Sequence, residues 1–418
     1  MKRLFSILCT VTMFMGMSLL MAQESPQNVF QTLTPEQRQQ IQAKLPELRR
    51  DIQSLPPARQ AERITQFLEE FQDLTPAQRQ PLRAAILRRF AGSAGNTGSA
   101  GNTGNAARVI PQNNVADPNN PFNHSLTALT DFGKETYQGK KAGLYPDGSN
   151  ERPAAHTAEG VRIAQAIQPL VTTGKTDAAN GKIVWISIGM SNTTQSTQAF
   201  LELMKDQSEK NPKLELVDGA FGGQAINQII DPNAAYWNNI VEQRLKPRGL
   251  TPEQVQIVWY KQAEMGPGNN YEATDFVKYT TDLKEKYTSV MRILKQKFPN
   301  LKLVYLSPRT YGGYAKTRLN PEPFAWYTGW TIKLLIEDQL NGDANLRFKG
   351  DDAPAAWLSW GPYIWANGEK PNTGGLSYEE SDFMQDGTHP SPSGRQKVAK
   401  ELHRFFTTDE TATPWFVR

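Results

Sequence analysis

The sequence contains almost no cysteine. Its 418 residues include a single one, Cys9, which lies within an apolar N-terminal run. One thiol in that place excludes a cysteine nucleophile, a thiolate metal site and a disulfide framework from the mature chain.

An excess of charge of one sign is also missing. The chain has 46 Lys and Arg against 42 Asp and Glu, a net charge of +4, and no basic block dominates any stretch. The sequence therefore gives no support to a nucleic-acid partner. The paired carboxylates Asp351-Asp352 and Glu379-Glu380 lack the spacing of metal ligands, so we predict neither a metal nor a cofactor.

Long apolar runs are confined to the N-terminus. Lys2 and Arg3 precede an apolar run over 4–21, and Ala22 is a suitable last residue before cleavage. These features predict a signal peptide over 1–22 and export to the periplasm or the exterior, without stable membrane insertion after cleavage. Leu20 is not the small residue expected two positions before Ala22, and the run approaches spanning length, so an uncleaved anchor is the alternative.

A short helical unit is expected over 31–92. Leu-Thr-Pro-Glu-Gln-Arg at 33–38 recurs as Leu-Thr-Pro-Ala-Gln-Arg at 74–79, and in each copy the Thr, Pro and Gln suit a helix start with a capping box. Apolar residues follow at helical spacing. We predict a small bundle of three or four helices. Its Arg and Glu residues are mixed, which favours a solvated helix face over a binding surface, and the partner of this unit is not indicated by the sequence.

A linker separates this unit from a larger domain. Gly-Ser-Ala-Gly-Asn-Thr occurs twice in tandem over 92–103, and such a repeat cannot bury a core. We assign 93–125 to a Gly/Ser/Asn-rich linker and 126–418 to the second domain.

Apolar runs alternate with helical patterns through the second domain. Four nearly continuous apolar runs are expected to be buried parallel strands: 183–188, 214–217, 255–260 and 301–306. Helical patterns are expected at 196–209, 226–245, 275–298, 324–340 and 391–406. This alternation predicts an α/β fold, a three-layer α/β/α sandwich around a central parallel sheet of the flavodoxin-like kind.

Chemically useful residues follow the predicted strands, where open α/β sheets bind ligands. Ser191 follows the first strand, and Gly222-Gly223 follow the second and can expose backbone N–H groups. Asp386 and His389 lie just before the last helix. Serine-dependent ester hydrolysis needs a base, a carboxylate to orient it and donors for the oxyanion. Ser191, His389 and Asp386 can supply the nucleophile, the base and its partner.

These blocks resemble the SGNH (GDSL-like) hydrolase superfamily over roughly 181–406. Gly-Met-Ser-Asn at 189–192 is nearest to the Gly-Gln-Ser-Asn start of carbohydrate-acetylesterase branches. The resemblance implies that Ser191 is the nucleophile, His389 the base and Asp386 its partner. It also implies an exported serine esterase that removes ester groups, which we expect to be O-acetyl groups, from a carbohydrate or a related substrate. The oxyanion hole implied by the resemblance is formed by the N–H groups of Ser191 and Gly223, and Gly222 is a close alternative to Gly223.

The block after the third strand departs from the family pattern. No Asn stands where the family's side-chain oxyanion donor is expected, and Lys261 and Gln262 are the available donors. Gln262 offers the same kind of amide N–H. Lys261 brings a positive charge, which could stabilise an oxyanion more strongly or bind an acidic substrate. The sequence leaves both open.

Three residues outside these blocks are candidates for contact with substrate. His156 closes a long loop ahead of the first strand, and long loops of this kind often reach a site. Trp360 and Trp365 lie in a Pro/Gly-rich stretch, where aromatic faces could stack on sugar rings. A purely structural role is the alternative for all three.

Two other functions remain open at this point. The chain could be a non-catalytic carbohydrate-binding module on the same fold, or an envelope interaction protein in which the helical unit over 31–92 is the working part. The joint presence of Ser191, Asp386 and His389 favours an enzyme, because a site without chemistry has no physical reason to keep all three.

Overall fold

A computed structural model describes residues 122 and 125–417 and part of the chain between 33 and 82. In that earlier part it describes 33–34, 36–37, 39–41, 44, 47–48, 51, 57–71, 73–75, 78 and 82. The predicted signal peptide over 1–22 and most of the linker lie outside the described residues. The chain divides into two compact units, 1–107 and 108–418, and each is considered by itself.

In the first unit, both predicted capping boxes are formed. The N–H of Thr34 donates to Gln37 Oε1 over 2.9 Å, and the Gln37 N–H donates back to Thr34 Oγ1 over 3.2 Å. Thr75 and Gln78 repeat the pattern at 3.0 and 3.3 Å. Helix α3 (Pro57–Glu69) is part of this unit. Among the residues described in this unit, a small core is formed by Leu33, Ile41, Leu48, Ile64, Phe67, Leu68, Phe71, Leu74 and Leu82.

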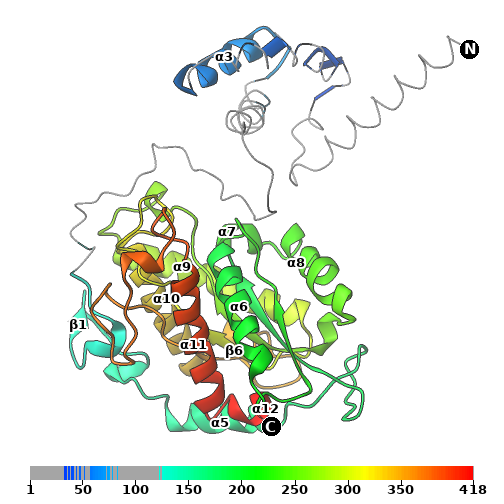
Figure 1. The fold of residues 1–418 in the computed structure, drawn as a ribbon, viewed down its shortest axis with the longest axis vertical. Helices are drawn as coiled ribbons and strands as arrows, with labels where there is room; N and C mark the ends of the chain where they lie inside the picture. Colours follow the sequence, from blue (N-terminus) through cyan, green and yellow to red (C-terminus); the bar gives the residue numbers. More distant parts are fainter. Residues whose placement is uncertain are drawn as a thin grey trace, which may run out of the picture. The chain divides into compact units, whose positions relative to one another are not determined.

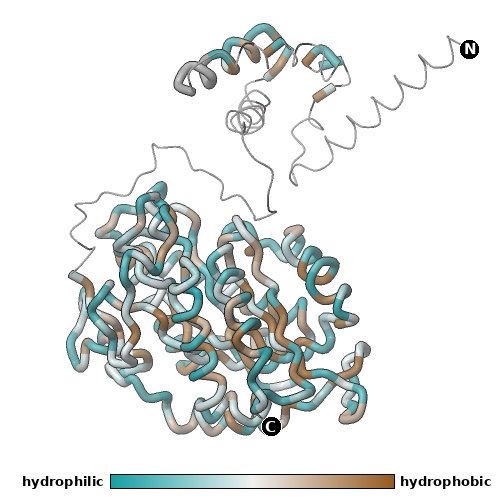
Figure 2. Tube along the Cα trace, viewed as in Figure 1, coloured by the Kyte–Doolittle hydropathy of each residue, from teal (hydrophilic) through white to brown (hydrophobic). Residues whose placement is uncertain are grey.

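The second unit contains a five-stranded sheet in which every neighbouring pair is parallel, in the order β4-β3-β5-β6-β7. Its strands are β3 (Ile183–Gly189), β4 (Leu214–Asp218), β5 (Val255–Lys261), β6 (Leu303–Leu306) and β7 (Trp357–Trp360). All residues of β3 and β5 are buried, which explains their continuous apolar sequences. Hydrophobic residues concentrate along these central strands in Figure 2. The four predicted strands are confirmed.

Strand β7 was not expected, because the sequence predicted a loop there. Its four residues lie between prolines at 354 and 362 and show no alternation of apolar and polar side chains. The strand exists because β6 offers it a partner, with Leu303 aligned with Trp357 and Leu306 with Trp360. Pairing of this kind is tertiary and leaves no local signal.

Helices cover the sheet in pairs. Figure 1 shows α6 and α11 side by side in front of the strands, with α9 and α10 behind α11, and each pair is in contact. The helices are α5 (Ala154–Gln165), α6 (Ser191–Leu203), α7 (Ile226–Ile229), α8 (Ala235–Ile240), α9 (Phe276–Lys297), α10 (Phe324–Leu340), α11 (Pro392–Thr408) and α12 (Thr413–Phe416). A two-stranded hairpin, β1 (Thr136–Tyr137) and β2 (Lys140–Lys141), precedes them.

Two helical predictions need correction. The single helix expected over 226–245 is divided into α7 and α8, because Asp231-Pro232-Asn233 interrupts it. The loop expected to end at His156 instead gives way to α5, which starts two residues earlier.

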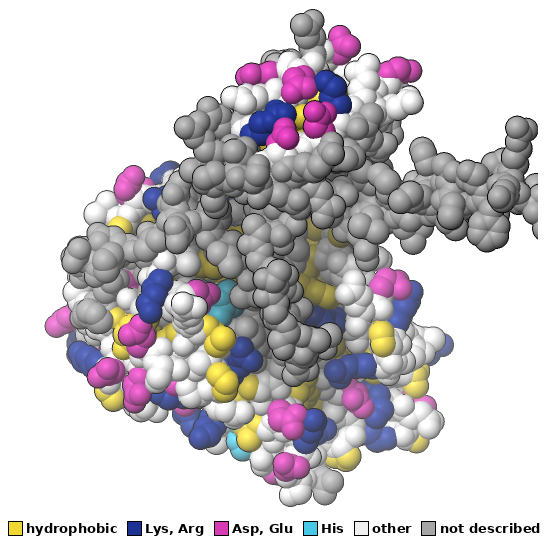
Figure 3. Space-filling model, turned by 45° about the horizontal axis from the view of Figure 1, so that its top comes forward, with side chains coloured by type: hydrophobic (Ala, Val, Ile, Leu, Met, Phe, Trp, Pro, Cys, Tyr) yellow, Lys and Arg dark blue, Asp and Glu magenta, His cyan; other side chains and the backbone are white. Residues whose placement is uncertain are grey.

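The described surface carries mixed charge. Figure 3 shows Lys and Arg side chains interspersed with Asp and Glu over one face, in keeping with the near-balanced composition. Among the described residues, no helix is both long and apolar enough to cross a membrane.

Candidate active site

Ser191 is placed by a close contact between two strands. It is the first residue of α6, directly after the end of β3. Gly189 is aligned with Lys261 of β5, and a Cβ at Gly189 would lie 2.3 Å from the Lys261 carbonyl oxygen. Only glycine fits there, so the turn that presents Ser191 at the carboxyl edge depends on it.

The structure brings Ser191, His389 and Asp386 together across 198 residues of chain. The Ser191 Oγ lies 2.7 Å from His389 Nε2, and His389 Nδ1 lies 2.5 Å from Asp386 Oδ2. With the proton on Nδ1, the imidazole donates to Asp386 and accepts from the Ser191 hydroxyl. The side chains of His389 and Asp386 are 21% and 27% exposed, so the triad is partly open to solvent.

A tight turn holds Asp386 and His389 in this relation. The N–H groups of Thr388 and His389 both donate to Asp386 Oδ1 over 3.0 Å. Gly387 has φ +65°, and a Cβ there would lie 1.7 Å from the Tyr314 carbonyl oxygen. Burial raises the pKa of Asp386, but the hydrogen bonds from the His389 ring and the two backbone N–H groups outweigh it and lower the pKa to about 2. The Asp386 carboxylate is therefore ionised at neutral pH and can accept the hydrogen bond that orients His389.

The glycine loop after β4 lies beside the nucleophile. A Cβ at Gly222 would lie 3.9 Å from the Ser191 Cβ, whereas nothing would lie within 4 Å of one at Gly223, which has φ +74°. Backbone N–H groups of this loop and of Ser191, at the N-terminus of α6, are thus the available oxyanion donors. Both glycines remain candidates for the second donor.

The two residues offered by the third strand are both occupied by protein groups. Lys261 Nζ donates to Asn192 Oδ1 over 3.0 Å, and the Gln262 side-chain amide donates to the Gln224 carbonyl oxygen over 2.8 Å. Lys261 is 1% exposed and Gln262 is fully buried. Gln262 thereby supports the residue that follows Gly223, and Lys261 holds the residue that follows Ser191. Burial lowers the pKa of Lys261 well below its usual range, and the nearby Arg309 lowers it further.

No role was predicted for Arg309, nor for Asn192 beyond its place in the Gly-Met-Ser-Asn motif. Asn192 is 2% exposed and accepts from Lys261. Arg309 lies three residues beyond β6, at the same edge of the sheet, and is 3% exposed. The residues after the fourth predicted strand would have revealed it, since the rule that drew attention to Ser191 applies equally there.

The three candidates for substrate contact are buried in protein contacts. His156 Nε2 lies 2.8 Å from the Leu358 carbonyl oxygen, and its ring stacks on Trp357 at 4.7 Å. Trp365 is fully buried and donates to Glu322 Oε1 over 2.8 Å. Trp360 is 2% exposed and donates to the Leu144 carbonyl oxygen over 2.6 Å. These contacts favour the structural alternative for all three.

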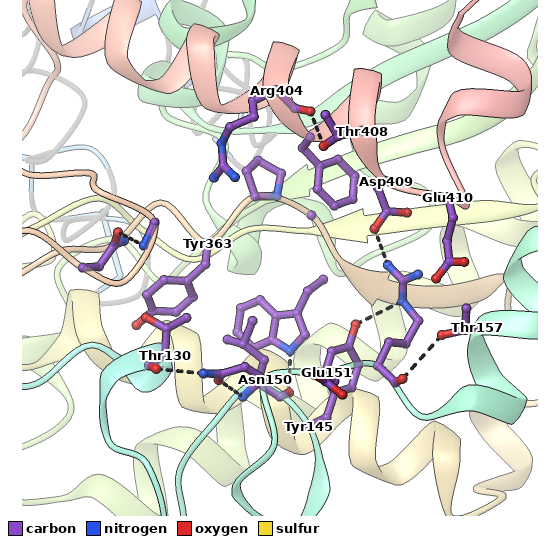
Figure 4. A pocket seen from close by; sticks show the side chains of 18 residues that line it. Thr130, Tyr145, Asn150, Glu151, Thr157, Tyr363, Arg404, Thr408, Asp409 and Glu410 are labelled. Carbon is purple, nitrogen blue, oxygen red and sulfur yellow. Dashed lines mark hydrogen bonds and ion pairs between the residues drawn. The ribbon is translucent and has the colours of Figure 1, made fainter.

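A separate cavity of about 650 Å³ lies beside Trp360. Figure 4 shows Tyr145 and Asp409 on its wall, within a set of hydrogen bonds and an ion pair. The Arg152 guanidinium connects them, since it donates to Asp409 over 2.7 Å, to Ser359 over 2.9 Å and to the Tyr145 hydroxyl over 3.3 Å. The wall of this cavity combines these polar groups with apolar residues such as Leu144 and Phe405, and it includes none of the residues of the triad.

The described part of the chain contains no cluster of side chains that could bind a metal ion. No group of three or more His, Cys, Asp or Glu residues is arranged there to hold an ion.

Comparison with known proteins adds little. No family model matches the chain, and no curated protein matches it. Among solved structures, the chain is similar to the salicylyl-acyltransferase SsfX3 from a tetracycline biosynthetic pathway, with 11% sequence identity and a TM-score of 0.30. The match covers 55% of each chain, so this protein spans about half the length of that one. A likeness at this level carries no argument.

Proposed function

We propose that this protein is a serine hydrolase that cleaves carboxylic esters, O-acetyl groups on a carbohydrate in the first instance. One observation carries the proposal: Ser191 Oγ, His389 and Asp386 form a continuous hydrogen-bonded chain at the carboxyl edge of a parallel sheet. The resemblance of these residues to the SGNH hydrolases supports it, and with it a three-layer arrangement of that family's kind.

The chemistry follows from the contacts. Ser191 Oγ attacks the ester carbonyl carbon while its proton passes to His389 Nε2, and Asp386 stabilises the imidazolium that forms. The N–H groups of Ser191 and of Gly222 or Gly223 stabilise the oxyanion. The tetrahedral intermediate collapses, the C–O bond to the alcohol breaks, and the alcohol leaves with the proton from His389. Water then attacks the acyl-enzyme by the same route and releases the acid.

The proposed mechanism does not require the Asn that the family places after the third strand. The backbone can supply two oxyanion donors without it, and the buried Lys261 fixes the residue after Ser191 through its hydrogen bond to Asn192. In this arrangement Lys261 is a positioning residue for the start of α6, and Gln262 is one for the glycine loop.

The test is turnover of 4-nitrophenyl acetate by the purified protein and by Ser191→Ala. We expect hydrolysis that Ser191→Ala abolishes, followed by release of acetate from acetylated polysaccharides. Ser289→Ala is the matched control, because Ser289 is exposed on α9 and bonds only to the Glu285 carbonyl oxygen of its own helix. Equal background rates in the protein and in Ser191→Ala would contradict the proposal and favour the alternative, a non-catalytic carbohydrate-binding module.

We also propose that the protein is exported, with cleavage after Ala22. N-terminal sequencing of the protein recovered outside the cytoplasm should begin at Gln23. A chain that retains Met1 in the membrane fraction would show the uncleaved anchor instead.

A further inference from the structure

Arg309 is a buried charge without a counter-ion. It is 3% exposed, and its Nε is a buried donor with no hydrogen-bond partner. Its backbone N–H donates to Thr328 Oγ1 over 2.9 Å, but the guanidinium forms no hydrogen bond or ion pair with any described residue. Burial lowers the pKa of Arg309 to about 10, which still leaves it positively charged at neutral pH.

The two carboxylates that act on Arg309 electrostatically, Asp386 and Glu322, are already engaged elsewhere. Asp386 holds His389. Glu322 accepts from the N–H groups of Gly312 and Trp326 and from the Trp365 indole. Both influence Arg309 electrostatically, yet neither forms an ion pair with it. Isolated buried charges are strongly unfavourable, so a site of this kind gains free energy when an anion enters it.

Arg309 follows β6 at the same edge of the sheet at which Ser191 follows β3. Strand β6 is the neighbour of β5, and beyond it the Ser307 N–H donates to the Tyr260 carbonyl oxygen over 2.9 Å. Its charge acts on both Lys261 and Asp386, which contact the residue after Ser191 and the catalytic base respectively. An anion bound by Arg309 would therefore lie at the sheet edge that also presents Ser191.

We propose that Arg309 binds a carboxylate carried by the ester substrate, so that the enzyme acts on acidic esters. The inference rests on the proposed function. A planar guanidinium fork matches the two oxygens of a carboxylate, and an anion held there would also favour the charged form of the buried Lys261 nearby. The carboxylate belongs either to the sugar, as in a uronic acid, or to the acyl group, as in a succinyl ester.

Turnover of matched substrates tests the proposal and separates the two sources. One pair is an O-acetylated galacturonoside and the same sugar with its carboxyl converted to a carboxamide. The other is 4-nitrophenyl hemisuccinate and 4-nitrophenyl acetate. We expect kcat/KM to favour the acid of one pair by at least about tenfold, which is about 1.4 kcal/mol. The ratio should fall toward one in Arg309→Met and lie between these values in Arg309→Lys.

Arg347→Met is the control, since Arg347 is exposed and already paired with Asp352, and it should leave the ratio unchanged. A ratio of one in the unmodified protein for both pairs, or a ratio that Arg309→Met does not alter, would overturn the proposal. Failure of the proposed function would look different, because no ester would be turned over at all.

A binding measurement tests whether Arg309 binds a carboxylate, and it does not depend on turnover. Thermal unfolding of Ser191→Ala is followed with glucuronate, succinate or acetate and, as neutral controls, glucuronamide and glucose. We expect at least one carboxylate to raise the Tm in a saturable way and Ser191→Ala/Arg309→Met to lose this shift. Without ligand, the added Arg309→Met substitution should raise the Tm, because it removes an unpaired buried charge. A raised Tm would also show that the double variant folds. Equal shifts in both proteins, or no shift with any carboxylate, would overturn the proposal.

Discussion

Two arginines of the same domain, Arg152 with a side chain that is 9% exposed and Arg309 at 3%, have opposite environments. Arg152 has Asp409 as a counter-ion at 2.7 Å, hydrogen bonds to Ser359 and Tyr145, and the face of Trp357 at 5.3 Å. Arg309 is at least as buried and has none of these. The environment of Arg152 raises its pKa, whereas burial lowers that of Arg309.

The difference separates structure from function. A charge whose partners are all supplied by the protein stabilises the fold, and it has nothing left to offer a ligand. A charge held without partners costs stability, and natural proteins accept such costs chiefly at functional sites. Arg309 lies at the sheet edge that also presents Ser191, whereas Arg152 lines the cavity of Figure 4.

The sharpest form of this comparison is a variant that changes turnover far more than stability. His389→Ala should lower turnover of 4-nitrophenyl acetate by about 10³-fold, because the general base is lost, and should cost no more than about 2 kcal/mol in the free energy of unfolding, because Asp386 loses its bond to the ring. His403→Ala is the control, since His403 bonds to Glu209 on the surface of α11, and its turnover should be unchanged. Equal losses in the two variants would contradict the assignment.

The converse variant should change stability. Arg152→Met leaves Asp409 without its buried partner, so we expect a loss of about 3–5 kcal/mol in the free energy of unfolding, measured by urea denaturation. Arg404→Met is the control: Arg404 is 59% exposed and paired with Glu401 within one helix, and its loss should be under about 1 kcal/mol. A stabilised Arg152→Met protein would break the comparison with Arg309.

Backbone constraint at the triad can be measured with two glycines. Gly387 and Gly375 both have positive φ, but only at Gly387 would a Cβ meet backbone, 1.7 Å from the Tyr314 carbonyl oxygen. Gly375→Ala should cost about 1 kcal/mol of stability from φ alone. Gly387→Ala should cost at least about 3 kcal/mol and also reduce turnover, because Asp386 and His389 must shift. Equal stability losses for the two variants would show that the turn is not constrained.

The smallest effect concerns pH. The pKa of Asp386 falls from 3.8 in the unfolded chain to about 2 in the folded protein, so its ionised form favours folding. This contribution, about 1–2 kcal/mol after allowance for solvent screening, is present above about pH 4 and is lost as the pH falls to about 2. Other carboxylates such as Asp382 also have a lowered pKa, so urea denaturation between about pH 5 and pH 2 should show a loss in both proteins, larger by about 1–2 kcal/mol in the unmodified protein than in Asp386→Asn. Parallel pH dependence in the two would contradict the cause given for the shift.

Much of the fold could be predicted from the sequence because its signals are local. Strands β3, β4, β5 and β6 have continuous apolar runs, and α10 has the predicted bounds. Strand β7 could not be predicted, because its only support is the edge of β6. The capping boxes of the first unit were predictable, since each needs only a Thr and a Gln three residues apart.

The site divides in the same way. Ser191, Asp386 and His389 could be chosen from their places after a strand and before a helix, and their contact then follows from the topology. The partners of Lys261 and Gln262 could not be inferred, because each lies on another element. The burial of Arg309 without a counter-ion is a property of the packed structure, and composition gives no hint of it.

The most direct test of the central claim is covalent labelling of Ser191. The full chain is treated with a fluorophosphonate, which reacts with activated serines, and the adduct is located by peptide mass spectrometry. We predict one adduct, on the peptide that contains Ser191, absent in Ser191→Ala and strongly reduced in His389→Ala. An unlabelled protein, or an adduct on another serine, would contradict a Ser191-dependent hydrolase.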